Sequence, residues 1–141
     1  MSESLQGLLA YRGVLLLFLG LLTGVAIPLV RSPRIGLSAH MAAIQSGLAL
    51  IGVAWLGSHL SLSDAWARAI AHTLWISFYV LWVGLLFGAV FGTGQALPLA
   101  GRGVTAGPWQ ERIATVLIAG SSIAVALAIG ALLLEWSWRP V

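Results

Sequence analysis

His40 is the residue whose type and position point most directly to chemistry. It stands in the segment Ser38–Gly47, inside a long apolar run, among alanine, serine and glycine residues that leave space beside it. An ionisable side chain within such a run is costly in a membrane and marks a candidate functional site. Imidazole is a common ligand of metals and of heme iron. His40 is therefore a candidate metal or heme ligand; the alternatives are a histidine bonded to a neighbouring helix and an interfacial one.

Four aromatic residues form a second candidate group. Trp75, Phe78, Tyr79 and Trp82 fall within about 100° of one another if this segment is a helix. A stripe of this kind is typical of ordinary packing or lipid contact, and it can also wall a ligand pocket. The Tyr79 hydroxyl falls deep in an apolar run, where it needs a hydrogen-bond partner.

The other two histidines are weaker candidates. His72 lies one heptad before Tyr79 and shares its helix face, whereas His59 falls near the end of an apolar run, within reach of lipid headgroups. No pair of histidines is placed to give heme two ligands from two helices.

The residue types that are missing also restrict the chemistry. There is no cysteine, which excludes thiolate ligands and cysteine nucleophiles. No acidic residue lies inside an apolar run, which argues against a proton-coupled exporter and against paired carboxylate catalysis; the four stand near run ends, at Glu3, Asp64, Glu111 and Glu135. Catalysis would have to use histidine, tyrosine and a bound cofactor.

The elements that position these residues are membrane-spanning helices. The chain is 60% hydrophobic and 8% charged, far too apolar to cover a soluble domain with charge. Charged residues divide it into four continuous apolar stretches, each long enough to cross a bilayer. The sequence predicts an all-α, integral membrane four-helix transmembrane bundle, one domain over 1–141, with helices at about 10–30, 37–61, 66–92 and 110–136.

Four crossings put both termini on one side of the membrane. The arginines, Arg12 among them, are expected as headgroup anchors near the run ends; they are split almost evenly between the two sides and predict no orientation. They form no basic stripe, which argues against nucleic-acid binding. Ser63 is the expected N-cap of the third helix, and Trp136 and Trp138 are an expected aromatic belt.

Glycines four residues apart suggest close helix contacts. Gly84, Gly88 and Gly92 share one face, as do Gly20 and Gly24 on the first helix. The spacing fits packing within one subunit and a contact between subunits equally well.

Several segments together resemble the hydroxylaminobenzene mutases. They are the stretch 33–40 that leads into His40, the stretch 20–24 followed by Pro28, Tyr79 with Trp82, and the stretch 92–101. These mutases are small four-helix membrane proteins that convert a phenylhydroxylamine to an aminophenol, and they resemble styrene oxide isomerases, which turn an aryl epoxide into an aldehyde.

The resemblance implies a ferric heme b bound by His40 and a homotrimer with heme at the subunit contacts. It places Tyr79 in the substrate pocket. Two positions depart from the family pattern, which has asparagine where this chain has Ser46 and Leu81. Serine can still donate a hydrogen bond at the first position, with a shorter reach, whereas leucine cannot at the second.

These observations combine into one functional hypothesis. The chain is expected to be an isomerase that rearranges a small aromatic N–O or epoxide substrate by Lewis-acid catalysis at ferric heme b, in the bilayer of a bacterial inner membrane. His40 would hold the metal, Trp75 and Trp82 would contact the cofactor, and Tyr79 and Ser46 would act on the substrate. The alternatives are a membrane heme carrier or sensor without turnover and a structural subunit with a merely packed His40.

Overall fold

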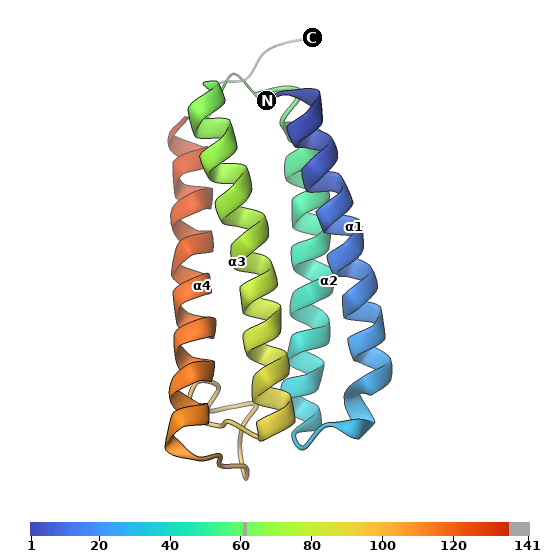
Figure 1. Ribbon diagram of the computed structural model, residues 1–141, viewed down its shortest axis with the longest axis vertical. Coiled ribbons are helices and arrows are strands. Elements are labelled where there is room, and N and C mark those ends of the chain that lie inside the picture. The colour runs from blue at the N-terminus through green and yellow to red at the C-terminus, as the bar shows by residue number, and fades with distance from the viewer. Residues whose placement is uncertain (61, 136–141) are drawn as a thin grey trace.

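Four long helices make up almost all of the described structure. The computed structural model describes residues 1–60 and 62–135, which contain α1 (Glu3–Ala26), α2 (Pro33–Leu56), α3 (Asp64–Phe91) and α4 (Pro108–Leu134), with a short 3₁₀ turn, η1 (Ile27–Leu29), after α1 (Figure 1). No strand occurs within these residues. Each of the four helices is long and apolar enough to cross a membrane. The prediction of an all-α transmembrane bundle is confirmed; Trp136 and Trp138 lie outside the described residues.

The first helix begins earlier than its apolar run suggests. α1 begins at Glu3 rather than near residue 10, because Leu5 and Leu9 already pack into the hydrophobic core. Arg12 therefore lies nine residues inside the helix, which is about 13 Å along its axis, rather than at its start. The later helices begin two to four residues before the expected positions, and Ser63 caps α3 by accepting a hydrogen bond from the Trp66 amide.

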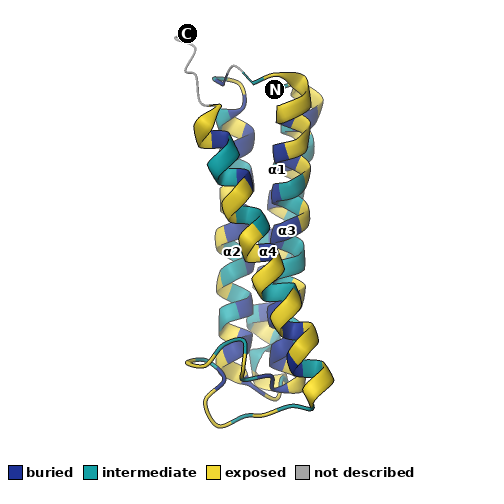
Figure 2. Cartoon of the chain, turned by 90° about the vertical axis from the view of Figure 1, so that its left-hand side faces the viewer, coloured by how far each residue is buried: buried dark blue, intermediate teal, exposed yellow. Residues whose placement is uncertain are grey.

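Each helix packs mainly on its neighbours in the chain. α1 lies against α2, α2 against α3, and α3 against α4, whereas α1 approaches α3 only lightly and α4 packs on α3 alone among the described helices (Figure 1). The N-terminus and the end of α4 lie at the same end of the bundle. The bundle is thus an open row of antiparallel neighbours. Much of α4 is exposed, including Val116, Ile123 and Leu127, as expected for a surface that faces lipid (Figure 2).

Glycines allow the helices to approach closely within the chain. A Cβ on Gly13 would lie 2.7 Å from the Gly47 carbonyl oxygen, and a Cβ on Gly47 would lie equally close to the Gly13 carbonyl, so α1 and α2 touch backbone to backbone. Gly20 faces Ala43 of α2 in the same way, and a Cβ on Gly84 would lie 2.9 Å from the Leu117 Cβ of α4. The glycine spacing seen in the sequence therefore provides packing inside one chain.

A buried carboxylate organises the long connection between α3 and α4. Glu111 is 3% exposed, and its carboxylate oxygens accept hydrogen bonds from the backbone amides of Gly94 (2.9 Å), Gln95 (3.0 Å) and Ala106 (3.2 Å). Three N–H donors stabilise the charged form of a carboxylate in place of a basic partner. Both ends of the loop are thereby fixed to the first turn of α4. Gly92 ends α3 with φ +73°, the left-handed conformation that favours glycine.

Gly13→Ala should loosen the α1–α2 contact. The added methyl group meets the Gly47 carbonyl, so the helices must separate, at a cost of about 1–3 kcal/mol. The expected result is a lower melting temperature in detergent. Gly7→Ala, on the same helix with open space around the new Cβ, is the control and should leave the melting temperature unchanged or slightly raised. Equal melting temperatures for the two variants would contradict the close contact.

Glu111→Gln should destabilise the loop between α3 and α4. The new amide nitrogen faces backbone N–H donors, so at least one of the three hydrogen bonds is lost, at a cost of about 1–3 kcal/mol. Faster proteolysis between residues 93 and 107 and a lower melting temperature are expected. Glu135→Gln makes the same change at the exposed end of α4 and should alter neither measurement; an unaffected Glu111→Gln protein would show that the loop is held by other contacts.

Candidate functional site

His40 lies in a gap between α1 and α2 that glycine creates. Its Nδ1 is 2.7 Å from the backbone carbonyl oxygen of Gly20. A Cβ on Gly24 would lie 2.8 Å from the same nitrogen, so a larger residue there would displace the ring. Because a carbonyl oxygen can only accept, Nδ1 carries the proton and donates it. In the neutral ring this leaves the lone pair on Nε2.

The second ring nitrogen of His40 is free to bind a ligand. Nε2 has no hydrogen-bond partner among the described residues, and protein atoms do not enclose it. The half-buried ring therefore opens to the surface of the bundle. A metal-ligating histidine normally donates its other N–H to a carbonyl or carboxylate in this way. Within residues 1–60 and 62–135 no three His, Cys, Asp or Glu side chains gather. A metal at His40 would therefore take its remaining ligands from a cofactor or substrate.

Trp82 packs on an adjacent face of the same stretch of α1. Its Nε1–H donates to the Thr23 hydroxyl oxygen at 3.1 Å, and that hydroxyl donates to the Leu19 carbonyl at 2.8 Å. Thr23 is next to Gly24, against which His40 packs. The stretch of α1 from residue 19 to 24 thus contacts both His40 of α2 and Trp82 of α3.

Tyr79 and Trp75 lie in the groove between α1 and α3, beside an arginine and nearer the N-terminal end of α1. The Tyr79 hydroxyl donates to the Arg12 backbone carbonyl at 2.9 Å. The Arg12 guanidinium carbon lies 4.7 Å from the centre of the Trp75 ring, and the Trp75 and Tyr79 rings meet edge to face at 6.0 Å. The Tyr79 hydroxyl thus has the partner that its depth required.

One chain does not bring all the predicted site residues together. His40 Nδ1 and the Tyr79 hydroxyl bond carbonyl oxygens of Gly20 and Arg12, which are eight residues, or about 12 Å, apart on α1. Ser46 is buried on α2, about 120° around the helix from His40. Leu81 is half-buried on α3. His40 and Trp82 are therefore level with each other, and Tyr79, Trp75 and Ser46 lie apart from them.

The other two histidines are peripheral, and the fourth aromatic residue is part of the core. His59 Nδ1 is 2.8 Å from the Ser58 hydroxyl near the end of α2, and His72, which is exposed, donates from Nδ1 to the Arg68 carbonyl at 2.9 Å. Phe78 is buried in the hydrophobic core.

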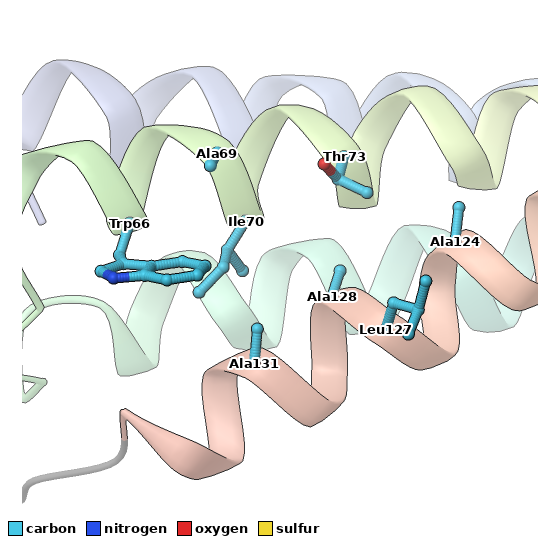
Figure 3. A pocket seen from close by; sticks show the side chains of 8 residues that line it. All are labelled: Trp66, Ala69, Ile70, Thr73, Ala124, Leu127, Ala128 and Ala131. Carbon is cyan, nitrogen blue, oxygen red and sulfur yellow. The ribbon is translucent and has the colours of Figure 1, made fainter.

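A cavity between α3 and α4 lies elsewhere in the bundle (Figure 3). It has a volume of about 350 Å³ and an almost wholly apolar lining that includes Trp66, Ile70, Leu127 and Ala131. None of the predicted site residues lines it. Its position and chemistry suit a lipid chain rather than a reaction.

Two residues have structural roles that the sequence does not predict. Arg12 is expected as an anchor at the start of the first helix, although the apolar residues on its N-terminal side, Leu8 and Leu9, could have signalled an earlier start. Glu111 is expected only as a charge at a helix end. Its role depends on amides of a loop that is folded back on it, for which the sequence offers no local signal.

The known proteins that this chain resembles are named as isomerases and mutases. The family model described as styrene oxide isomerase matches residues 5–137. Hydroxylaminobenzene mutase HabA of Ectopseudomonas oleovorans is 34% identical over 115 residues, covering 81% of this chain and 85% of the relative. Hydroxylaminobenzene mutase HabB of the same organism is 29% identical over 128 residues, covering 90% and 77%. No solved structure matches.

The chain belongs to the styrene oxide isomerase family. It is therefore an isomerase, and its four apolar helices make it a multi-pass integral membrane protein. The family resemblance expected from the sequence is confirmed.

Tyr79→Phe should remove one inter-helix hydrogen bond and preserve the ring packing. The loss of the bond to the Arg12 carbonyl should lower the free energy of unfolding by about 0.5–1.5 kcal/mol, measured by denaturant unfolding in detergent. The other tyrosine supplies the control, since Tyr11 is 64% exposed and Tyr11→Phe should have no effect. A Tyr79→Phe protein as stable as the wild type would mean that the bond contributes nothing in the membrane protein.

Proposed function

We propose that this isomerase rearranges a small aromatic N–O or epoxide substrate with a ferric heme b held by His40. The observation that carries the proposal is the hydrogen bond from His40 Nδ1 to the Gly20 carbonyl, which leaves the Nε2 lone pair accessible and unpartnered among the described residues. The curated relatives are named for mutase activity on hydroxylaminobenzene, which supports an arylhydroxylamine as the first substrate to test. We place the protein in the inner membrane of a bacterium.

The residues around His40 fit such a cofactor. The imidazole is fixed by its own hydrogen bond and by the absence of side chains on Gly20 and Gly24. A single histidine ligand suits a macrocycle that provides four nitrogen ligands of its own. The chemistry that ferric heme supplies when bound is Lewis-acid withdrawal of electrons from a substrate oxygen.

The chain's own residues would control the fate of the substrate once its N–O or C–O bond is cleaved. Positive charge then develops on the arene, and an aromatic wall stabilises it through ring faces while excluding the water that would trap it. Trp82 is best placed for this role because it is level with His40. Trp75 lies seven residues, or about 10 Å, from Trp82 along α3, so its contact with the cofactor stays a prediction. The Tyr79 hydroxyl already donates a hydrogen bond to the Arg12 backbone carbonyl. In this conformation it can therefore offer a substrate only its oxygen lone pairs. A catalytic role for Ser46 stays a prediction.

We propose that a homotrimer completes the site. His40 Nε2 opens outward from the chain, and the Tyr79 hydroxyl is bonded about 12 Å away along α1. A neighbouring copy that packs against α1 and α2 would cover the open side of His40 and exclude water there. The exposed apolar residues of α1, among them Phe18, Leu21 and Val25, give such a copy a surface to cover.

His40→Ala should abolish heme binding and leave the helices in place. The absorbance spectrum of protein purified in detergent after supply of heme should show a Soret band for the wild type and none for His40→Ala, because no other described side chain offers a ligand at this position. His59→Ala and His72→Ala are the controls and should keep the band.

Turnover of hydroxylaminobenzene to an aminophenol should parallel the Soret band across these variants. If wild-type protein supplied with heme shows no band, the mechanism has no Lewis acid and the proposal fails. If His72→Ala removes the band and His40→Ala does not, the ligand lies on α3 instead. A heme-loaded protein that converts neither an arylhydroxylamine nor an aryl epoxide would be a carrier.

A further inference from the structure

The groove between α1 and α3 contains an arginine without a carboxylate partner. Arg12 lies about 13 Å inside α1. Within residues 1–60 and 62–135 the acidic side chains are at helix ends, and none forms an ion pair with it. An arginine inside a membrane-spanning helix is costly unless something pairs with it. The close partner that its guanidinium has among the described residues is the face of Trp75.

Two hydrogen-bond donors in this groove are enclosed and have no acceptor among the described residues. They are Nε of Arg12 and Nε1 of Trp75. An enclosed donor without a partner carries a desolvation penalty, so native structures rarely leave one unexplained. The terminal nitrogens of Arg12 have no hydrogen-bond partner in the described part of the chain and remain accessible. The groove thus offers the terminal N–H donors of Arg12 and their positive charge to a ligand that can accept.

A cleft lies next to this pair, toward the end of the bundle where α1 and α3 begin. It has a volume of about 350 Å³ and is lined by Ser2, Ser4, Leu5, Leu8, Arg68 and His72. On α1, Leu8 is one helical turn from Arg12 toward the N-terminus. On α3, Arg68, His72 and Trp75 follow one face, and the His72 and Trp75 rings are 6.4 Å apart. The cleft therefore lies one helical turn from the Arg12–Trp75 pair along both helices.

We propose that this groove binds the phosphate of an anionic membrane lipid. The arginines at its two ends supply the positive charge and the fork of donors that suit phosphate oxygens. The hydroxyls of Ser2 and Ser4 can donate at the mouth, and Leu5 and Leu8 give an acyl chain an apolar surface. Glu3 and Asp64 begin the two helices near the mouth, and neither is ion-paired with Arg12, so the inner arginine keeps its charge for the phosphate.

The lipid would hold together two helices that pack poorly on each other. α1 and α3 make little direct contact, and the polar links between them in the described residues are the Tyr79 bond to Arg12 and the Trp82 bond to Thr23. A phosphate that bridges Arg12 and Arg68 would join the two helices nearer the end of the bundle at which both begin, beyond both of these bonds. This inference does not depend on heme, because the groove and its ligand can be tested on protein without cofactor.

Native mass spectrometry of the full chain in detergent, titrated with phosphatidylglycerol, tests the proposal. The wild type should retain one tightly bound phosphatidylglycerol and prefer it to phosphatidylcholine, whose choline cation would meet the arginines. Arg12→Gln and Arg68→Gln should each weaken binding about tenfold. Arg102→Gln removes an exposed arginine from the loop at the opposite end and should bind as the wild type does.

Three outcomes would overturn the proposal. They are equal binding by wild type and Arg12→Gln, an equal loss in Arg102→Gln, and equal affinity for phosphatidylglycerol and phosphatidylcholine. If Arg12→Gln does not fold, Arg68→Gln decides the question, because Arg68 is exposed and its replacement leaves the core intact. Arg12→Lys, which keeps the charge and loses the fork of donors, should bind with intermediate affinity.

Discussion

The backbone contact between α1 and α2 is the constraint on which the rest of the structure depends. In a bilayer, lipid removes most of the hydrophobic drive for helices to associate, so close approach has to supply the packing energy. Gly13 and Gly47 touch at one end of this contact, and Gly20 and Gly24 extend it to the other. The same missing side chains that let the helices meet also provide the gap for the His40 ring and expose the Gly20 carbonyl to it. Packing and chemistry thus have one origin.

The second half of the bundle is built more loosely. α4 packs on α3 alone among the described helices, and its connection to α3 is held by a buried carboxylate and backbone amides rather than by an apolar core. The aromatic residues of α3 reach across to α1 through two hydrogen bonds, from Tyr79 and Trp82. The predicted site is therefore supported by close backbone packing on the side of His40 and by two hydrogen bonds on the side of the aromatic residues.

The sequence was sufficient for the architecture because the bilayer makes simple demands. A span needs about twenty apolar residues and a helical backbone, and both are visible in a charge-bounded run. His40 could be singled out for the same reason. A carbonyl or hydroxyl partner behind its ring could be expected, but its identity as the Gly20 carbonyl could not, since the bond joins two helices whose relative rotation is set by packing. The predicted position of Arg12 was wrong because the start of α1 depends on burial of Leu5 and Leu9 by other helices.

The sequential packing of the helices also has a consequence for biogenesis. Since the helices pack chiefly on their neighbours in the chain, the contacts that define the fold are local in the sequence. Local topologies close small loops and form quickly. An emerging helix pair can assemble while the ribosome is still translating the remainder, and the last helix need only find its immediate predecessor. The helices can therefore pack in the order in which they occur along the chain as it enters the membrane.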